Sequence, residues 1–371
     1  MVDWSNLPGE LVILISEKLD SEFYILRFRS VCTTWRGLVP KPHNLPYNFP
    51  KNTVISIPSC ISKRSFFLIK PHNQFPWLIK SSQDSRPKTR LWNPVSFDSC
   101  FHSLFFNYLN FTQFNVLDLG HYFVHHYYFY PVKLVVATWQ RKEQPPSLLT
   151  FNPTGQLAMF RSGDHQLTLI PDGTGYIDIC VSKGRPYAVA SDGRMVTIGP
   201  DYSVCLAAEP ILGGNNFKFL VECDGELLLV QFGGGACSLS FWEHENDVDD
   251  NDCKNADPKI DVFRLDKKKK KWVELTSLGD KVLFLGDKCG FAVSASDLCV
   301  AKGNCVIFET KEDILKPLEC EMSVYHLDHK GWIQPLSDYL GYSNLFWPPP
   351  DWTGFRDFQK QLLSLKGLCC E

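Results

Sequence analysis

The start of the chain carries apolar residues at the spacing of an amphipathic helix. Four of them recur at intervals of three and four, which places them on one helical face. They are Leu11, Leu14, Ile15 and Leu19. Pro8 precedes them, and proline suits the first helical position because its fixed φ fits and its missing N–H would have no partner there. The pattern predicts a helix that begins near Pro8.

Two shorter helices are predicted after this one. Ser21 follows a break in the stripe and can cap a second helix, and a third begins near Ser30 and ends before Pro40, because helices usually stop ahead of proline. The apolar residues of the second helix are Phe23, Leu26 and Phe28. Those of the third are Val31, Cys32, Trp35, Leu38 and Val39. We therefore expect residues 1–40 to form a small all-α unit of three helices.

This helical unit is too small to bury all of its apolar surface. Three helices within about 35 residues fall below the size at which a domain usually supports its own core. Four further apolar residues lie off the predicted stripes, and we expect them to stay exposed. They are Leu7, Val12, Ile13 and Ile25. Apolar surface left on a small unit indicates a protein partner, so this unit reads as a docking module.

The period of the pattern changes from 3.6 to 2 after a predicted linker over residues 41–52. Prolines at 42, 46 and 50 favour an extended, stiff linker. Short runs rich in β-branched and aromatic residues then recur to about Leu336, and they predict strands. Examples are Thr53–Ile57, Ser65–Ile69, Val132–Trp139, Gln166–Ile170 and Lys218–Val221.

Turn signals between these runs predict how the strands pair. Asp192-Gly193 and Asp224-Gly225 each separate two strand-like runs, which is a hairpin signal. Two similar segments, 262–266 and 324–328, are each followed by a tryptophan and read as a strand, a polar turn and a returning strand. Many short strands over about 290 residues favour an all-β propeller of about six blades over a sandwich. We assign it residues 53–352.

The pattern predicts three non-strand segments in the second half of the chain. Residues 243–259 are acidic and without periodicity, which predicts a surface loop. An aromatic and proline-rich segment spans 346–352, and we expect it to stitch the last blade. Residues 353–371 read as a tail that contains a short C-terminal helix, predicted over 354–365.

Composition narrows the class of protein. The chain has 371 residues with 44% apolar residues, enough for a substantial core, and a net charge of −3 that argues against a general nucleic-acid binder. Its start lacks the features of a secretory signal, and no apolar run is long enough to suggest a membrane span. We therefore expect an intracellular protein of the nucleus, the cytoplasm or both, whose 14 cysteines are mostly buried small hydrophobes.

The candidate chemical motifs in the sequence are interpreted as structural features. Phosphate-loop, zinc-protease and serine-hydrolase motifs are missing from the sequence, so we expect no catalytic residue and no cofactor. Gly233-Gly234-Gly235 reads as a wide turn. His121, His125 and His126 lack acidic or cysteine neighbours in sequence, so we expect no metal site. Lys267–Lys271 reads as a solvated hairpin turn, with a nuclear import signal as the alternative.

Two stretches of the helical unit resemble an F-box. The first is Leu7-Pro8-x-Glu10-Leu11, and the second runs from Leu26-Arg27-Phe28-Arg29-Ser30-Val31-Cys32 to Trp35-Arg36. The resemblance implies docking onto a Skp1-like adaptor and, through it, onto a cullin. We predict that six residues form or support that surface: Leu7, Pro8, Leu11, Ile15, Val31 and Trp35. A helical cap packed only on the rest of the chain is the alternative interpretation.

The remainder of the chain is similar to the plant KIB-type F-box family, in which a β-propeller follows the F-box. The segments that carry the similarity are 182–198, 219–231, 262–291 and 303–308. The resemblance implies a non-catalytic substrate-recognition subunit of an SCF ubiquitin ligase, whose propeller binds a protein target that the sequence does not identify. Two alternatives stay open: an F-box scaffold that binds the adaptor without driving ubiquitination, and a propeller enzyme such as a glycan-acting one.

Overall fold

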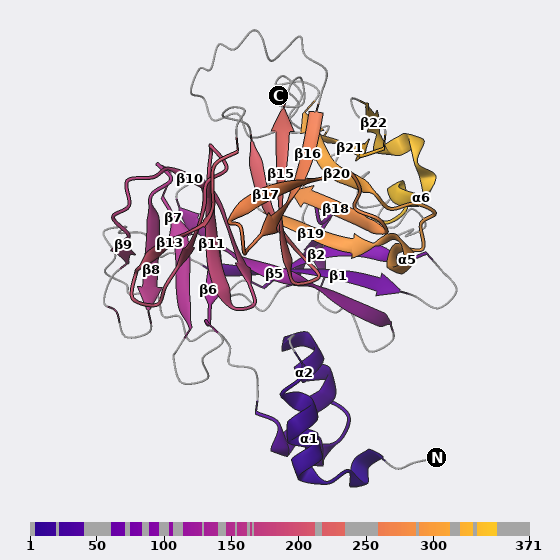
Figure 1. Cartoon of the computed structure of the whole chain (residues 1–371). Helices are drawn as coiled ribbons and strands as arrows, with labels where there is room; N and C mark the ends of the chain where they lie inside the picture. The colour runs from indigo at the N-terminus through magenta and orange to yellow at the C-terminus, as the bar shows by residue number, and fades with distance from the viewer. Residues whose placement is uncertain are drawn as a thin grey trace, which may run out of the picture. The chain divides into compact units, whose positions relative to one another are not determined.

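The computed structural model divides the chain into two compact units, Met1–Asn52 and Thr53–Glu371 (Figure 1). The residues that it describes are 4–19, 22–40, 61–70, 75–83, 89–95, 104–106, 114–127, 130–139, 146–152, 154–161, 164, 167–211, 217–233, 259–286, 289–311, 320–328 and 332–346. Several predicted features lie outside them: the linker 41–52, the strand Thr53–Ile57, the acidic stretch 243–258, and the C-terminal tail with its helix.

The described residues of the first unit form three α-helices, as predicted, preceded by a short 3-10 helix that the sequence pattern did not indicate. The elements are η1 (Trp4–Asn6), α1 (Gly9–Ser16), α2 (Glu22–Arg29) and α3 (Thr33–Leu38). Pro8 is the N-cap of α1. Cys32 caps α3, because its Sγ accepts a hydrogen bond from the Trp35 N–H at 3.5 Å. The third helix was predicted to begin near Ser30, and it begins three residues later, at Thr33.

The first unit buries a different face of α1 from the predicted one. Val12, expected to lie off the stripe and exposed, is fully buried against Trp35 and Val39. Leu7 and Ile25 are partly buried against this cluster. The helix is apolar on almost every side, so its spacing does not single out one face. Packing against α3 makes that choice, and the predicted stripe is left outside.

The described residues of the second unit form four β-sheets, here named A to D in chain order. Sheet A has nine strands: β1 (Ile61–Lys70), β2 (Trp77–Gln83), β3 (Thr89–Trp92), β4 (Leu104–Phe106), β5 (Asn115–Tyr127), β6 (Tyr130–Ala137), β7 (Ser147–Phe151), β8 (Leu157–Arg161) and β9 (Thr168–Leu169). Sheet B has four: β10 (Tyr176–Ser182), β11 (Arg185–Ala190), β12 (Met195–Ile198) and β13 (Val204–Ala208).

Sheets C and D complete the unit. Sheet C has β14 (Lys218–Cys223), β15 (Glu226–Gly233), β16 (Lys259–Asp266) and β17 (Lys271–Leu275). Sheet D has β18 (Lys281–Gly286), β19 (Cys289–Ser294), β20 (Cys305–Lys311), β21 (Cys320–His326) and β22 (Ile333–Pro335). Three short helices flank sheet D: α5 (Ala295–Leu298), η4 (Leu336–Asp338) and α6 (Leu340–Ser343).

Four buried hydrophobic clusters join the sheets in a closed ring. One cluster joins sheets A and D, where the Phe66 and Phe291 rings stack at 4.6 Å, and Figure 1 shows β1 beside β18 and β19. A second joins D and C, where Phe308 and Phe232 meet edge to face at 5.1 Å. The remaining two join C with B and B with A. Sheets that pack face to face around a ring define the predicted propeller.

Sheet A and sheet D depart from a plain series of four-stranded blades. Strand β5 pairs antiparallel with β1, so two blade-sized groups form one continuous sheet. In sheet D, β18 and β20 pair in parallel. The described strands make five blade-sized groups, while the expected number of about six concerns the whole chain and stays a prediction.

The ends of the propeller are tied together by its last described residues. Phe346 forms a bridge with Leu78 of β2, and the Leu78 N–H donates to the Leu345 carbonyl at 2.6 Å. Phe346 also packs against Phe284 of β18, with ring centroids 6.0 Å apart. This is the start of the aromatic and proline-rich segment predicted to stitch the last blade; its remaining residues lie outside the described ranges.

A buried ion pair links three of the sheets. The Lys133 ammonium of β6 donates to Asp178 Oδ1 of β10 at 2.7 Å, and both side chains are at least 89% buried. Asp178 Oδ2 accepts the backbone N–H of Leu220 in β14 at 2.8 Å. A β-bulge between Tyr176 and Asp178 shifts the register of β10 at this point. Bulges commonly re-aim a side chain, and here Asp178 reaches sheets A and C.

Candidate functional site

The first unit exposes a group of large apolar side chains, which we call the apolar face. It comprises Leu11, Ile13, Leu14, Ile15, Leu26 and Val31. Leu14 and Val31 are each 54% exposed, although both are residues that a folded domain normally buries. The buried cluster of this unit has only Val12, Trp35 and Val39 at its centre. The unit therefore covers little of its own apolar surface.

The six predicted site residues occupy three different environments. Pro8, Leu11, Ile15 and Val31 are exposed, and Leu7 is half-buried against the core cluster. Trp35 is buried and its ring lies 4.3 Å from that of Phe28. Its side chain can therefore support the face from beneath, while the four exposed residues are available for contact.

Three residues of the apolar face were not among the predicted site residues: Ile13, Leu14 and Leu26. Leu14 and Leu26 were assigned to helix stripes but were not named as site residues. On the same helix as Leu26, the Arg27 guanidinium lies over the Phe23 ring at 5.6 Å, so α2 also carries a cationic group on an aromatic side chain. The sequence signal that marks Ile13 and Leu14 is the run of five apolar residues at 11–15, which no single buried stripe can accommodate.

The lysine run forms a hairpin turn, as predicted. Residues 267–270 connect β16 to β17, and Asp266 Oδ1 accepts the N–H groups of Lys268 and Lys269, each at 3.0 Å. These hydrogen bonds, that of Lys269 first, lower the pKa of Asp266. The Lys270 carbonyl accepts the Glu209 N–H at 2.9 Å, which ties the turn to the segment after β13. Whether this turn is also an import signal stays a prediction.

The histidine and glycine motifs are described only in part, since the side chains of His125 and His126 and the residues Gly234 and Gly235 lie outside the described part of the chain. His121 is an exposed residue of β5 whose ring contacts Phe123, and Gly233 ends β15. In the part of the chain that the structure describes, no cluster of His, Cys, Asp or Glu is suited to holding a metal ion. No helix in the same part has both the length and the apolarity to cross a membrane.

The described cysteines are free thiols with varied exposure. Cys180, Cys289 and Cys305 are buried, whereas Cys205 and Cys299 are exposed. The expectation that cysteines are mostly buried small hydrophobes therefore fits only part of this set. Burial raises the pKa of the Cys305 thiol to about 11, while its hydrogen bond to Tyr342 acts in the opposite direction.

A small helical unit with exposed apolar residues, followed by a ring of sheets, defines a two-unit protein with a docking module and a propeller. Comparison with known families gives the same division: residues 4–47 match the F-box domain and residues 46–328 match the KIB1-4 beta-propeller. The chain therefore belongs to the F-box proteins that carry a KIB1-4 β-propeller.

Individual relatives match over nearly the whole chain. F-box protein SKIP23 of Arabidopsis thaliana is 33% identical over 398 residues, covering 95% of this chain and 96% of that protein. F-box protein At2g17036 of the same plant is 32% identical over 401 residues, covering 95% of each. Putative F-box/kelch-repeat protein At5g24040 is 26% identical, covering 95% of this chain and 99% of that protein.

Proposed function

We propose that the chain is the substrate-recognition subunit of an SCF ubiquitin ligase. The F-box unit binds a Skp1-like adaptor and through it a cullin, and the propeller binds a protein target for ubiquitination and proteasomal degradation. The observation that carries the proposal is the apolar face of an F-box unit too small to cover it. The chain would act in the nucleus, the cytoplasm or both.

The proposed role of this chain is positional. Holding a target beside a ubiquitin-charged partner raises the effective concentration of the reacting groups, so the chain needs no catalytic residue of its own. The match of this chain to both an F-box and a KIB1-4 beta-propeller supports this division of labour. Within it, Leu11, Ile15 and Val31 would contact the adaptor, and Trp35 would hold the helices that carry them.

Adaptor capture by the full chain tests the proposal. Leu11→Asp and Val31→Asp place a charge on exposed positions, so the unit stays folded while the apolar contact is lost. Burying one leucine is worth about 1.5–3 kcal/mol, so each variant should weaken capture of a Skp1-like adaptor by at least about tenfold. Val273→Asp on β17 is the matched control, because Val273 is 43% exposed and Leu11 is 45% exposed.

A second variant separates support from contact. Trp35→Ala removes a buried aromatic side chain, which costs about 3–5 kcal/mol, so it should lose both helicity and adaptor capture. Unchanged capture by Leu11→Asp, Val31→Asp and Trp35→Ala together would refute adaptor docking through this face. Recovery of a cullin with the wild-type chain supports the ligase, and recovery of the adaptor without a cullin would overturn it in favour of a scaffold.

A further inference from the structure

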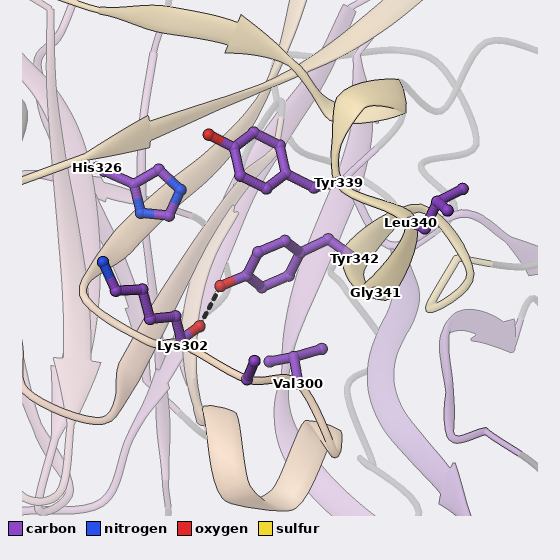
Figure 2. Close-up of a pocket in the computed structure, with 8 residues that line it drawn as sticks. Val300, Lys302, His326, Tyr339, Leu340, Gly341 and Tyr342 are labelled. Atoms are coloured by element: carbon purple, nitrogen blue, oxygen red, sulfur yellow. Dashed lines mark hydrogen bonds between the residues drawn. The ribbon is translucent and has the colours of Figure 1, made fainter.

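The propeller contains a pocket of about 420 Å³ beside sheet D. Figure 2 shows the ring of Tyr339, which follows η4, pointing toward His326 at the end of β21, and the ring of Tyr342 in α6 pointing toward Lys302. The segment from Val300 to Lys302 closes the opposite side. Leu340 and Gly341 complete the lining. A volume of this size is in the range of sites that hold a small molecule or an anchoring side chain.

Hydrogen bonds hold the two tyrosine side chains that line the pocket. The Tyr342 hydroxyl donates to the Lys302 carbonyl, and it lies 3.5 Å from Cys305 Sγ. Burial raises the pKa of Tyr342, so this hydroxyl keeps its proton. The Tyr339 hydroxyl donates to Gln334 Oε1. Since its walls are held by hydrogen bonds, a ligand would bind with little loss of conformational entropy.

The lining has one charged group that a ligand can reach. Lys302 carries the only fixed positive charge among the eight lining residues, and its side chain is 67% exposed. The Lys302 ammonium forms an ion pair with Asp328 Oδ2 at 4.0 Å, the longest distance at which such a pair is counted. Asp328 Oδ1 accepts from Asn304 Nδ2 at 2.5 Å, which holds this carboxylate in place. Because the pair is long and the Lys302 side chain is exposed, a second carboxylate can approach the ammonium.

Exposed apolar side chains lie at and near the pocket. Leu340, a lining residue, is 75% exposed. Trp332 is 72% exposed. It lies near the lining residue His326, because the residues next to each of them in sequence, Ile333 and Tyr325, are paired between β22 and β21. Large apolar side chains this exposed are commonly part of binding surfaces. The site thus combines an apolar hollow, aromatic walls and a cation at the edge.

We propose that this pocket binds an acidic segment of a target protein, with one aromatic or aliphatic side chain in the hollow and an adjacent carboxylate on Lys302. The inference deepens the proposed function, on which it rests, by placing a target contact on the propeller. Charge complementarity with Lys302 selects the acidic neighbour, and the apolar lining selects the anchoring side chain.

Peptide binding to the full chain tests this assignment by fluorescence anisotropy. The probe is a labelled six-residue peptide with one phenylalanine between glutamates; the controls replace phenylalanine by alanine or the glutamates by lysines. Each control should bind at least about tenfold more weakly. Equal binding of the three peptides would overturn the inference.

Two substitutions locate the binding. Gly341→Phe fills the pocket and should lose the probe, whereas Gly341→Ala should keep it, because an added Cβ would meet only Val300 Cγ1, at 3.8 Å. Lys302→Glu should reverse the charge preference, so that the lysine peptide binds more tightly. Unchanged binding by Gly341→Phe, or an unchanged preference in Lys302→Glu, would refute the site.

Adaptor capture distinguishes this inference from the proposed function. Gly341→Phe should still capture a Skp1-like adaptor, because the F-box unit is untouched. If the adaptor is captured and the peptide does not bind, the pocket assignment fails while the ligase proposal stands. If the peptide binds and the adaptor is not captured, the pocket assignment holds and the ligase proposal fails.

Discussion

The buried ion pair between Lys133 and Asp178 should be a main determinant of propeller stability. Asp178 joins sheet B to sheet A through the Lys133 ammonium and to sheet C through the Leu220 N–H. Asp178→Asn keeps the size of the side chain and an oxygen for the Leu220 N–H, but it removes the charge that compensates Lys133. The NH2 group that replaces the other oxygen cannot accept from Lys133, so the perturbation removes both the charge and the Lys133 hydrogen bond.

The expected cost follows from burial. The Lys133 side chain is 7% exposed and that of Asp178 is 11% exposed, so solvent screens the pair poorly. Removing one partner of such a pair leaves an uncompensated buried charge and typically costs about 3–5 kcal/mol. We expect Asp178→Asn to lower the free energy of unfolding by about 3 kcal/mol. Lys133→Met with Asp178→Asn should restore most of this loss, because replacing both charges is often nearly neutral.

Urea unfolding of the full chain, followed by circular dichroism, measures the change in the propeller transition. Hydrogen exchange at the Leu220 amide reports on the same contact locally. Glu226→Gln is the control, because the Arg264–Glu226 pair is 3.6 Å long and about half exposed, and such pairs contribute at most about 1 kcal/mol. A loss below about 0.5 kcal/mol in Asp178→Asn, or strict additivity in the double variant, would refute the reasoning.

Two further predictions concern backbone geometry and thiol reactivity. Gly155 has φ +80°, and a Cβ added there would lie 2.7 Å from Tyr176 N. Gly155→Ala should therefore lower the free energy of unfolding, measured by thermal unfolding, by at least about 1–3 kcal/mol. Gly175→Ala is the control: its added Cβ would have its nearest contact at 3.7 Å, so the loss should be less than about 1 kcal/mol. At pH 8, iodoacetamide should alkylate the exposed Cys299 much faster than the buried Cys305, whose pKa is about 11, as followed by mass spectrometry; equal rates would contradict the burial argument.

The strands of the propeller were largely predictable because they depend on local signals. Ser65–Ile69 lies within β1, and Lys218–Val221 lies within β14. The Asp192-Gly193 and Asp224-Gly225 turns lie between paired antiparallel strands, as their sequences indicate. An Asp-Gly pair tolerates the positive φ that a tight hairpin turn requires, so the information is contained in two neighbouring residues.

The sheet connections were not predictable from the same signals. Strand β1 pairs with β5, although 44 residues separate their ends. The segment 303–308 reads as a strand, but nothing in it indicates that β20 pairs in parallel with β18. Long-range pairing depends on how whole sheets pack, and alternation along one strand fixes its buried face without naming its neighbour.

The candidate docking site shows the same limit on a smaller scale. The sequence predicted an F-box unit and six residues for its surface, but it left Val12, which is buried, off the predicted stripe of α1. Five consecutive apolar residues satisfy several helical stripes equally well. Whether Val12 or Leu11 is buried depends on which of them packs against Trp35, and this tertiary contact is not encoded in the local pattern.

The sequence by itself determined the class of this protein: three short helices, a change of period, and a long series of strands with turn residues between them. The tertiary structure decided which apolar residues remain exposed, how four sheets close into a ring, and that Tyr339, Tyr342, His326 and Lys302 surround one pocket. Local periodicity reflects the conformation of each segment, whereas a surface or a pocket depends on side chains brought together from distant parts of the chain.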